Sequence, residues 1–144
     1  MQHQITELDD LARELEETGD YRVLRRLKPR EPTPTPAGYT GELGILIDFE
    51  TTGVDPAKDE IIEVAMVKFR YSDSDEITGI CDIFQSFNQP SRPIPAEIVK
   101  LTGITDAMVA GHTIDAEKLE AFVSDAQIVI AHNAAFDRPF AEQS

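Results

Sequence analysis

The chain has 144 residues, of which 41% are hydrophobic, which suits one globular domain with an additional segment. No apolar run approaches the roughly 18 residues of a membrane span, and the start lacks a signal-peptide pattern, so we expect a cytoplasmic protein without a membrane partner. The single Cys81 excludes an internal disulfide and fits a reducing compartment. The net charge of −14 argues against sequence-independent binding along duplex DNA, because such binding requires a basic surface that displaces counterions.

Charge is distributed unevenly between the two ends of the chain. Residues 1–30 hold six of the 13 basic and seven of the 27 acidic residues, so residues 31–144 carry a net charge of −13. Apolar residues at helical spacing predict a first helix that Gly19 ends, followed by a second short helix over 20–28 with a basic outer face. That face is either solvated or contacts nucleic acid or an acidic partner.

These patterns predict three regions. Residues 1–28 form a helical N-terminal extension. Residues 29–41 contain repeated prolines, which favour an extended, semi-rigid linker. Residues 42–144 form the main domain.

The main domain begins with three segments typical of strands. Residues 44–49 are nearly all apolar, as expected for a strand that is covered on both faces. Residues 60–71 and 77–87 predict the second and third strands, and the acidic turn between them predicts a hairpin. The three strands are therefore expected to pair in antiparallel fashion.

Helices are expected to dominate the rest of the domain. Pro95 and Asp106 mark the starts of two short helices, and Asp115 caps a third. Residues 126–131 predict a compact buried strand. Asn133 is positioned to cap a final helix, in which we expect a kink or break near Pro139, since proline lacks the amide hydrogen that a helix uses. The order of elements predicts an α/β fold, with the site where strand ends meet a helix start.

The stretch that suggests chemistry is the end of the first strand. Side chains alternate along a strand, so Asp48 and Glu50 point to one face and Phe49 to the other. Two neighbouring carboxylates repel each other unless a cation lies between them, and Mg²⁺ and Mn²⁺ prefer oxygen ligands. With Asp137 in the first turn of the last helix, three carboxylates could hold two cations about 4 Å apart. The alternative is a pair of hydrated acids beside a turn.

Three segments resemble motifs of a known family. Ile-Asp-Phe-Glu-Thr-Thr-Gly at 47–53 resembles the first motif of the DEDD (DnaQ-like) exonucleases, which include the proofreading epsilon subunit of bacterial DNA polymerase III. His-Asn-Ala-Ala-Phe-Asp at 132–137 resembles the second motif, and residues 94–109 resemble the segment beside the family's substrate cleft. The resemblance covers about residues 43–140 and keeps the family's order.

The resemblance implies a ribonuclease H-like fold, with three antiparallel strands, a parallel strand and helices packed on the sheet. It also implies a 3′→5′ exonuclease that hydrolyses phosphodiester bonds with two divalent cations, Mg²⁺ or Mn²⁺. The implied partners are nucleic acid with a 3′ end, in particular single-stranded DNA, and a DNA polymerase subunit in a proofreading context of DNA replication.

The resemblance also assigns roles to single residues. It implies that Asp48, Glu50 and Asp137 are the catalytic, metal-binding acids. The implied substrate-binding residues are Thr51, Thr52, Gly53, Ile104, Asn133 and Phe136. Among these, Ile104 is expected to wedge against a terminal base, Asn133 to act mainly as a helix cap, and Phe136 to pack beneath the site.

The chain departs from the family pattern after Phe140. The resemblance implies a third motif, a His followed five residues later by a fourth metal-binding Asp, and no residues remain to supply it. We therefore expect the C-terminal part of the domain to be missing and the 144-residue chain to be weak or inactive by itself. Two alternatives stay open: a catalytically incomplete module that binds nucleic acid or a polymerase, and an exoribonuclease of the same superfamily that trims RNA.

Overall fold

The computed structural model describes residues 2–28, 30–74 and 76–142. The chain divides into two compact units, Met1–Arg30 and Glu31–Ser144, and each is described by itself.

The first unit contains the helix α1, Gln2–Glu17. Gly19, with φ of 78°, ends it as predicted, and its amide donates to the Glu16 carbonyl at 3.1 Å. The second helix expected over 20–28 is wrong, because residues 21–28 have no regular structure. The apolar side chains there, such as Leu24, are exposed, so a short helix has no packed face to stabilise it. Instead Arg25 pairs with Asp9 at 2.9 Å.

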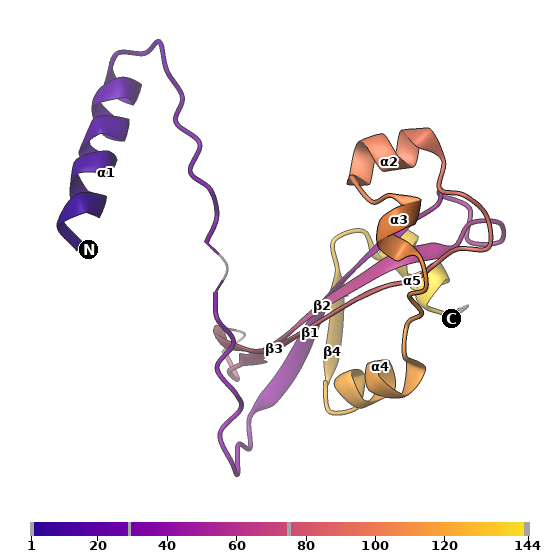
Figure 1. Ribbon diagram of the computed structural model, residues 1–144. Helices are drawn as coiled ribbons and strands as arrows, with labels where there is room; N and C mark the ends of the chain where they lie inside the picture. The colour runs from indigo at the N-terminus through magenta and orange to yellow at the C-terminus, as the bar shows by residue number, and fades with distance from the viewer. Residues whose placement is uncertain (1, 29, 75, 143–144) are drawn as a thin grey trace. The chain divides into compact units, whose positions relative to one another are not determined.

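The second unit is built on a four-stranded mixed sheet of order β3-β2-β1-β4 (Figure 1). Strand β1 (Glu42–Thr51) pairs antiparallel with β2 (Ile61–Tyr71), and β2 pairs antiparallel with β3 (Ile77–Phe87). Strand β4 (Ile128–Ala131) runs parallel to β1. These strands and their directions confirm the predicted mixed sheet.

Four short helices accompany the sheet: α2 (Ala96–Thr102), α3 (Asp106–Val109), α4 (Ala116–Val123) and α5 (Ala134–Ala141). The Asp115 carboxylate caps α4 by accepting from the Lys118 amide at 3.1 Å, as predicted. We expected a kink or a break near Pro139, and the break is wrong, because α5 continues through this residue. In so short a helix the proline removes only one internal hydrogen bond.

Two apolar clusters hold these elements together. The first joins one face of β1 and β2 to α4 and includes Ile45, Phe49 and Phe122. The second lies where β2 begins and β3 ends, beside α2 and α3 (Figure 1), and includes Ile62 and Ile104. The main domain therefore positions the end of β1 between two packed groups of helices and strands.

The opposite face of the sheet is less covered than expected. Leu46 of β1 is 43% exposed, although we expected both faces of this strand to be buried. Strand β4, expected to be buried, is also exposed, with Val129 at 57%. The reason is that β4 pairs only with β1 among the described strands, so one of its edges and part of each face lack a neighbour.

A charged side chain lies within the covered face. Lys68 is buried, and its Nζ contacts the Asp125 carboxylate at 2.6 Å and lies 4.7 Å from the centre of the Phe122 ring.

In the described part of the chain, no helix has the length and apolar character needed to cross a membrane.

We predict that Asp125→Ala lowers the free energy of unfolding by about 2 kcal/mol, because it leaves the buried Lys68 ammonium without its partner. The cost is below that of a fully buried pair, since the Asp125 side chain is 55% exposed. The matched control is Glu142→Ala, which breaks the exposed Arg138–Glu142 pair and should cost less than about 0.5 kcal/mol. Equal urea midpoints for the two variants would contradict this account.

Candidate functional site

Two carboxylates of β1 share the less covered face of the sheet. Asp48 is exposed and lies opposite Ala65 of β2, whereas Glu50 is half-buried and lies opposite Glu63. Phe49, between them, is buried on the other face. The alternation predicted from the sequence is therefore present, and it places the two acids side by side.

The surroundings of Glu50 disfavour its charged form. Its pKa is raised above the ordinary value, first by burial, then by the negative charge of Asp48, and then by that of Glu63. Glu63 is a site-adjacent acid that sequence reasoning missed, because only the register of β1 against β2 brings it opposite Glu50. The Gln85 amide donates to the Glu63 carboxylate at 2.6 Å and so orients it.

The turn after β1 is closed by hydrogen bonds between its two ends. Thr51 and Thr52 are buried. The Thr52 amide donates to the Glu60 carbonyl at 2.9 Å, and the Glu60 amide donates back to the Thr52 hydroxyl at 2.9 Å. The Thr51 hydroxyl donates to the Gly53 carbonyl. The Thr-Thr-Gly segment therefore has a defined backbone conformation directly beside Asp48 and Glu50.

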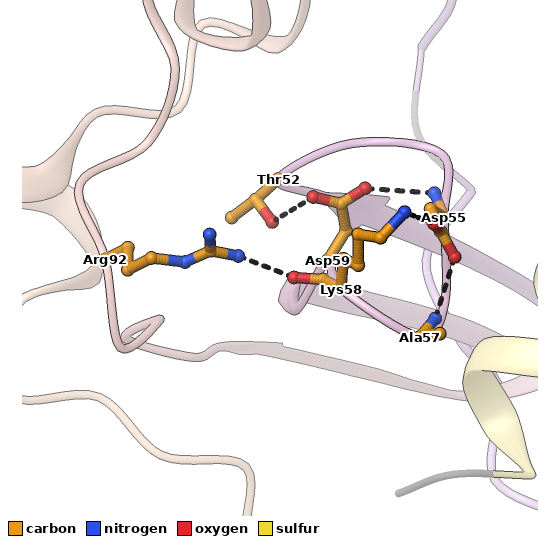
Figure 2. A network of polar contacts seen from close by, with 6 residues as sticks. All are labelled: Thr52, Asp55, Ala57, Lys58, Asp59 and Arg92. Atoms are coloured by element: carbon orange, nitrogen blue, oxygen red, sulfur yellow. Dashed lines mark hydrogen bonds and ion pairs between the residues drawn. The ribbon is translucent and has the colours of Figure 1, made fainter.

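A polar network continues through this loop (Figure 2). The Asp55 carboxylate accepts from the Lys58 ammonium at 2.6 Å and from the Ala57 amide at 3.1 Å, and these hydrogen bonds lower its pKa. Arg92, which precedes α2, donates to the Lys58 carbonyl at 2.6 Å. The loop is thus tied to a segment that follows β3.

The second predicted motif lies at the start of α5. Asn133 occupies the N-cap position as predicted, but its side chain makes no capping hydrogen bond, and its carbonyl accepts from the amides of Phe136 and Asp137. Asp137 is buried, at 3% exposure. Phe136 is half-buried, with its ring 5.1 Å from that of Phe140.

Two other residues of the predicted motifs occupy contrasting places. Ile104 is buried in the second apolar cluster, so a contact with a terminal base requires its side chain to leave that cluster. His132 is exposed and lines, with Asp48 and Ile130, a shallow hollow on the less covered face of the sheet.

The donor chemistry of the site fits a hard divalent cation. Asp48 and Glu50 supply carboxylate oxygens from one strand face, where burial and then the negative charges of Asp48 and Glu63 raise the pKa of Glu50. Across the described residues, no three His, Cys, Asp or Glu side chains lie together in a position to hold one ion. The structure therefore brings Asp48 and Glu50 together on β1, but it does not place Asp137 with them as a third ligand of one ion.

Comparison with known proteins identifies the family. The family model described as Exonuclease matches residues 45–144, which include both motifs. The chain belongs to this family of DEDD-type exonuclease domains. Its sheet and helices have the ribonuclease H-like fold.

Individual relatives are similar to part of the chain. DNA polymerase III PolC-type of Caldanaerobacter subterraneus subsp. tengcongensis is 39% identical over 106 residues, and that of Bacillus subtilis is 39% identical over 102 residues. These matches cover 72% and 69% of this chain but only 7% of each relative. The chain thus spans a small part of the length of these relatives.

Solved structures agree on the fold. Exonuclease I of E. coli in complex with a dT13 oligonucleotide superposes with a TM-score of 0.54 at 18% identity, covering 69% of this chain and 22% of that one. Exonuclease I in an ExoI/SSB-Ct complex gives a TM-score of 0.55 at 17% identity, covering 70% and 23%.

We predict that Asp48→Asn stabilises the protein at pH 7 by on the order of 0.5 kcal/mol, because it removes a like charge beside Glu50. The raised pKa of Glu50 means that the folded state holds its proton more tightly than the unfolded chain does. Stability therefore falls as pH rises from the ordinary pKa of a glutamate to the raised pKa of Glu50. The gain should therefore shrink at pH 4, where Glu50, with its raised pKa, binds a proton. Urea unfolding at both pH values measures it.

The control for this measurement is Glu120→Gln, which removes one negative charge from an exposed position on α4. It should leave the urea midpoint unchanged at both pH values. A destabilised Asp48→Asn protein at pH 7 would contradict the repulsion described for β1.

Proposed function

We propose that the chain carries part of the active site of a 3′→5′ exonuclease that removes nucleotides from single-stranded DNA with two divalent cations, Mg²⁺ or Mn²⁺. The observation that carries the proposal is the pair of neighbouring carboxylates, Asp48 and Glu50, on one face of β1, where the pKa of Glu50 is raised. The family assignment and the fold shared with exonuclease I, whose solved complex contains an oligonucleotide, support the substrate class.

In this proposal the acids have one shared role. Asp48 and Glu50 would hold the cations, and Asp137, from the start of α5, would complete the carboxylate set. When bound, such cations lower the pKa of water and stabilise the charge on the leaving oxygen. The position of Asp137 in the first turn of α5, within the part of the chain that the Exonuclease family model matches, supports this role.

The remaining residues would bind the substrate. The backbone of Thr51, Thr52 and Gly53 would lie against the terminal nucleotide, since the hydrogen bonds of this turn fix its conformation beside the acids. Asn133 and Phe136 would line or support the site from α5. We place the exonuclease domain at residues 42–144.

We also propose a polymerase-associated role, in which the activity proofreads newly synthesised DNA in the cytoplasm. The similarity to DNA polymerase III PolC-type proteins supports this context. Because the chain spans 7% of those relatives, the polymerase partner is part of the proposal and requires its own test.

We predict that the protein, with Mn²⁺ or Mg²⁺, slowly shortens a 5′-labelled single-stranded oligonucleotide one nucleotide at a time. Because we expect only weak activity from the 144-residue chain, the rate is measured under single-turnover conditions with excess protein. Asp48→Asn should reduce this rate about a hundredfold or more, because cations supply several kcal/mol of transition-state stabilisation. Glu120→Gln, which changes the same net charge far from β1 in sequence, should keep the wild-type rate.

The products distinguish the alternatives. Release of the labelled 5′-terminal nucleotide as the first product would contradict the proposed 3′→5′ polarity. Retention of the oligonucleotide without shortening, at high protein and metal concentrations, would contradict hydrolysis and indicate a binding module. Faster shortening of RNA than of DNA of the same sequence would contradict the proposed substrate.

A further inference from the structure

The loop that joins β1 to β2 is closed by one carboxylate that neither motif contains. Asp59 lies just before β2, and its two oxygens reach Thr52 at the start of the loop and Asp55 in its middle (Figure 2). Its Oδ2 accepts from the Asp55 amide at 2.9 Å. Its Oδ1 accepts from the Thr52 hydroxyl at 3.4 Å. Asp59 thus links the proposed nucleotide-binding turn to the far side of its own loop.

The same carboxylate packs directly against Gly53. A Cβ atom added at Gly53 would lie 2.4 Å from Asp59 Oδ2 and 2.6 Å from its Cγ, so the Asp59 carboxylate would have to move to admit one. Gly53 is not among the glycines with positive φ, so a larger side chain there would act on the turn by displacing the Asp59 carboxylate. Asp59 therefore shapes the surface of the turn as well as its hydrogen bonds.

The hydrogen bonds of Asp59 and those that close the turn share the Thr52 hydroxyl and so form one network. The Thr52 hydroxyl, which donates to Asp59, also accepts from the Glu60 amide at 2.9 Å. The Asp59 amide donates to the Asp55 carbonyl at 2.8 Å. Removing the Asp59 carboxylate would free the Thr52 hydroxyl and the Asp55 amide together, while the backbone bond between Thr52 and Glu60 would remain.

We infer that Asp59 is a positioning residue, which sets the affinity for the substrate strand by holding the Thr51-Thr52-Gly53 turn in its binding conformation. The inference rests on the proposed function, because it assigns to this turn the contact with the terminal nucleotide. Asp59 acts through Thr52 and Gly53 and has no role in the chemical step. Its loss therefore weakens binding and leaves the rate of hydrolysis of bound substrate nearly unchanged.

A second acid in the same loop provides a matched control. Asp55 bonds the Lys58 ammonium and the Ala57 amide through its carboxylate, and that carboxylate makes no described contact with Thr52 or Gly53. Asp55→Ala keeps the Asp55 amide that donates to Asp59. It removes the same charge from the same loop without touching the proposed link.

The experiment compares dissociation constants for a 5′-fluorescein oligo-dT with phosphorothioate linkages at its 3′ end, measured by fluorescence anisotropy with Mn²⁺. Asp59→Ala should weaken binding about tenfold, since two hydrogen bonds of the turn are lost. Asp59→Asn should bind within about threefold of wild type, because an amide accepts from the Asp55 amide and donates to the Thr52 hydroxyl. Asp55→Ala should bind like wild type.

A second readout reports on the free protein. Amide hydrogen exchange at Asp55 should be faster in Asp59→Ala than in wild type and Asp59→Asn. If Asp59→Ala does not fold, Asp59→Ser replaces it, because a hydroxyl on so short a side chain cannot reach both partners. It is expected to weaken binding in the same way.

The outcomes separate this inference from the function on which it rests. If the wild type binds the oligonucleotide and Asp59→Ala binds it equally well, the role of Asp59 is overturned and the proposed function is not. Equal weakening by Asp59→Ala and Asp55→Ala would also overturn it, since that indicates a general effect of the loop. A wild-type protein that neither binds nor shortens the oligonucleotide would overturn the proposed function, and the role of Asp59 with it.

Discussion

Alternation of side chains along β1 is the constraint on which the rest of the site depends. Ile45 and Phe49 enter the apolar cluster with α4, so Asp48 and Glu50 must face the other way, next to each other. The pKa of Glu50 is raised there, first by its own burial and then by the negative charges of Asp48 and Glu63. The same packing that stabilises the sheet creates a local excess of negative charge suited to cations.

The turn after β1 is also fixed in its conformation, so the backbone that follows the two acids has a defined position. Thr52 is bonded to both Glu60 and Asp59, and Gly53 lies against the Asp59 carboxylate. Thr52, at the start of the loop, is thus held by Asp59 and Glu60 at its end. In the proposed reaction, the acids would supply the chemistry and the turn would supply the position of the substrate.

Local patterns predicted the strands and the pair of acids well, because alternation and apolar content act over a few residues. They predicted neither the exposure of β4 nor the burial of Ile104, since both depend on which elements pack against each other. The second helix over 20–28 failed for the same reason, as its apolar residues find no partner. No local sequence pattern pointed to Asp59 or Glu63. The position of Asp59 depends on how the loop closes, and that of Glu63 depends on the register between β1 and β2.

The central claim is that Asp48, Glu50 and Asp137 act on the same cations. The most direct measurement is paramagnetic broadening of backbone amide signals by low concentrations of Mn²⁺, compared with an equal concentration of Ca²⁺ as a diamagnetic reference. The account predicts broadening centred on the end of β1 and on the first turn of α5 together. Broadening at β1 that leaves the signals of α5 sharp would contradict it.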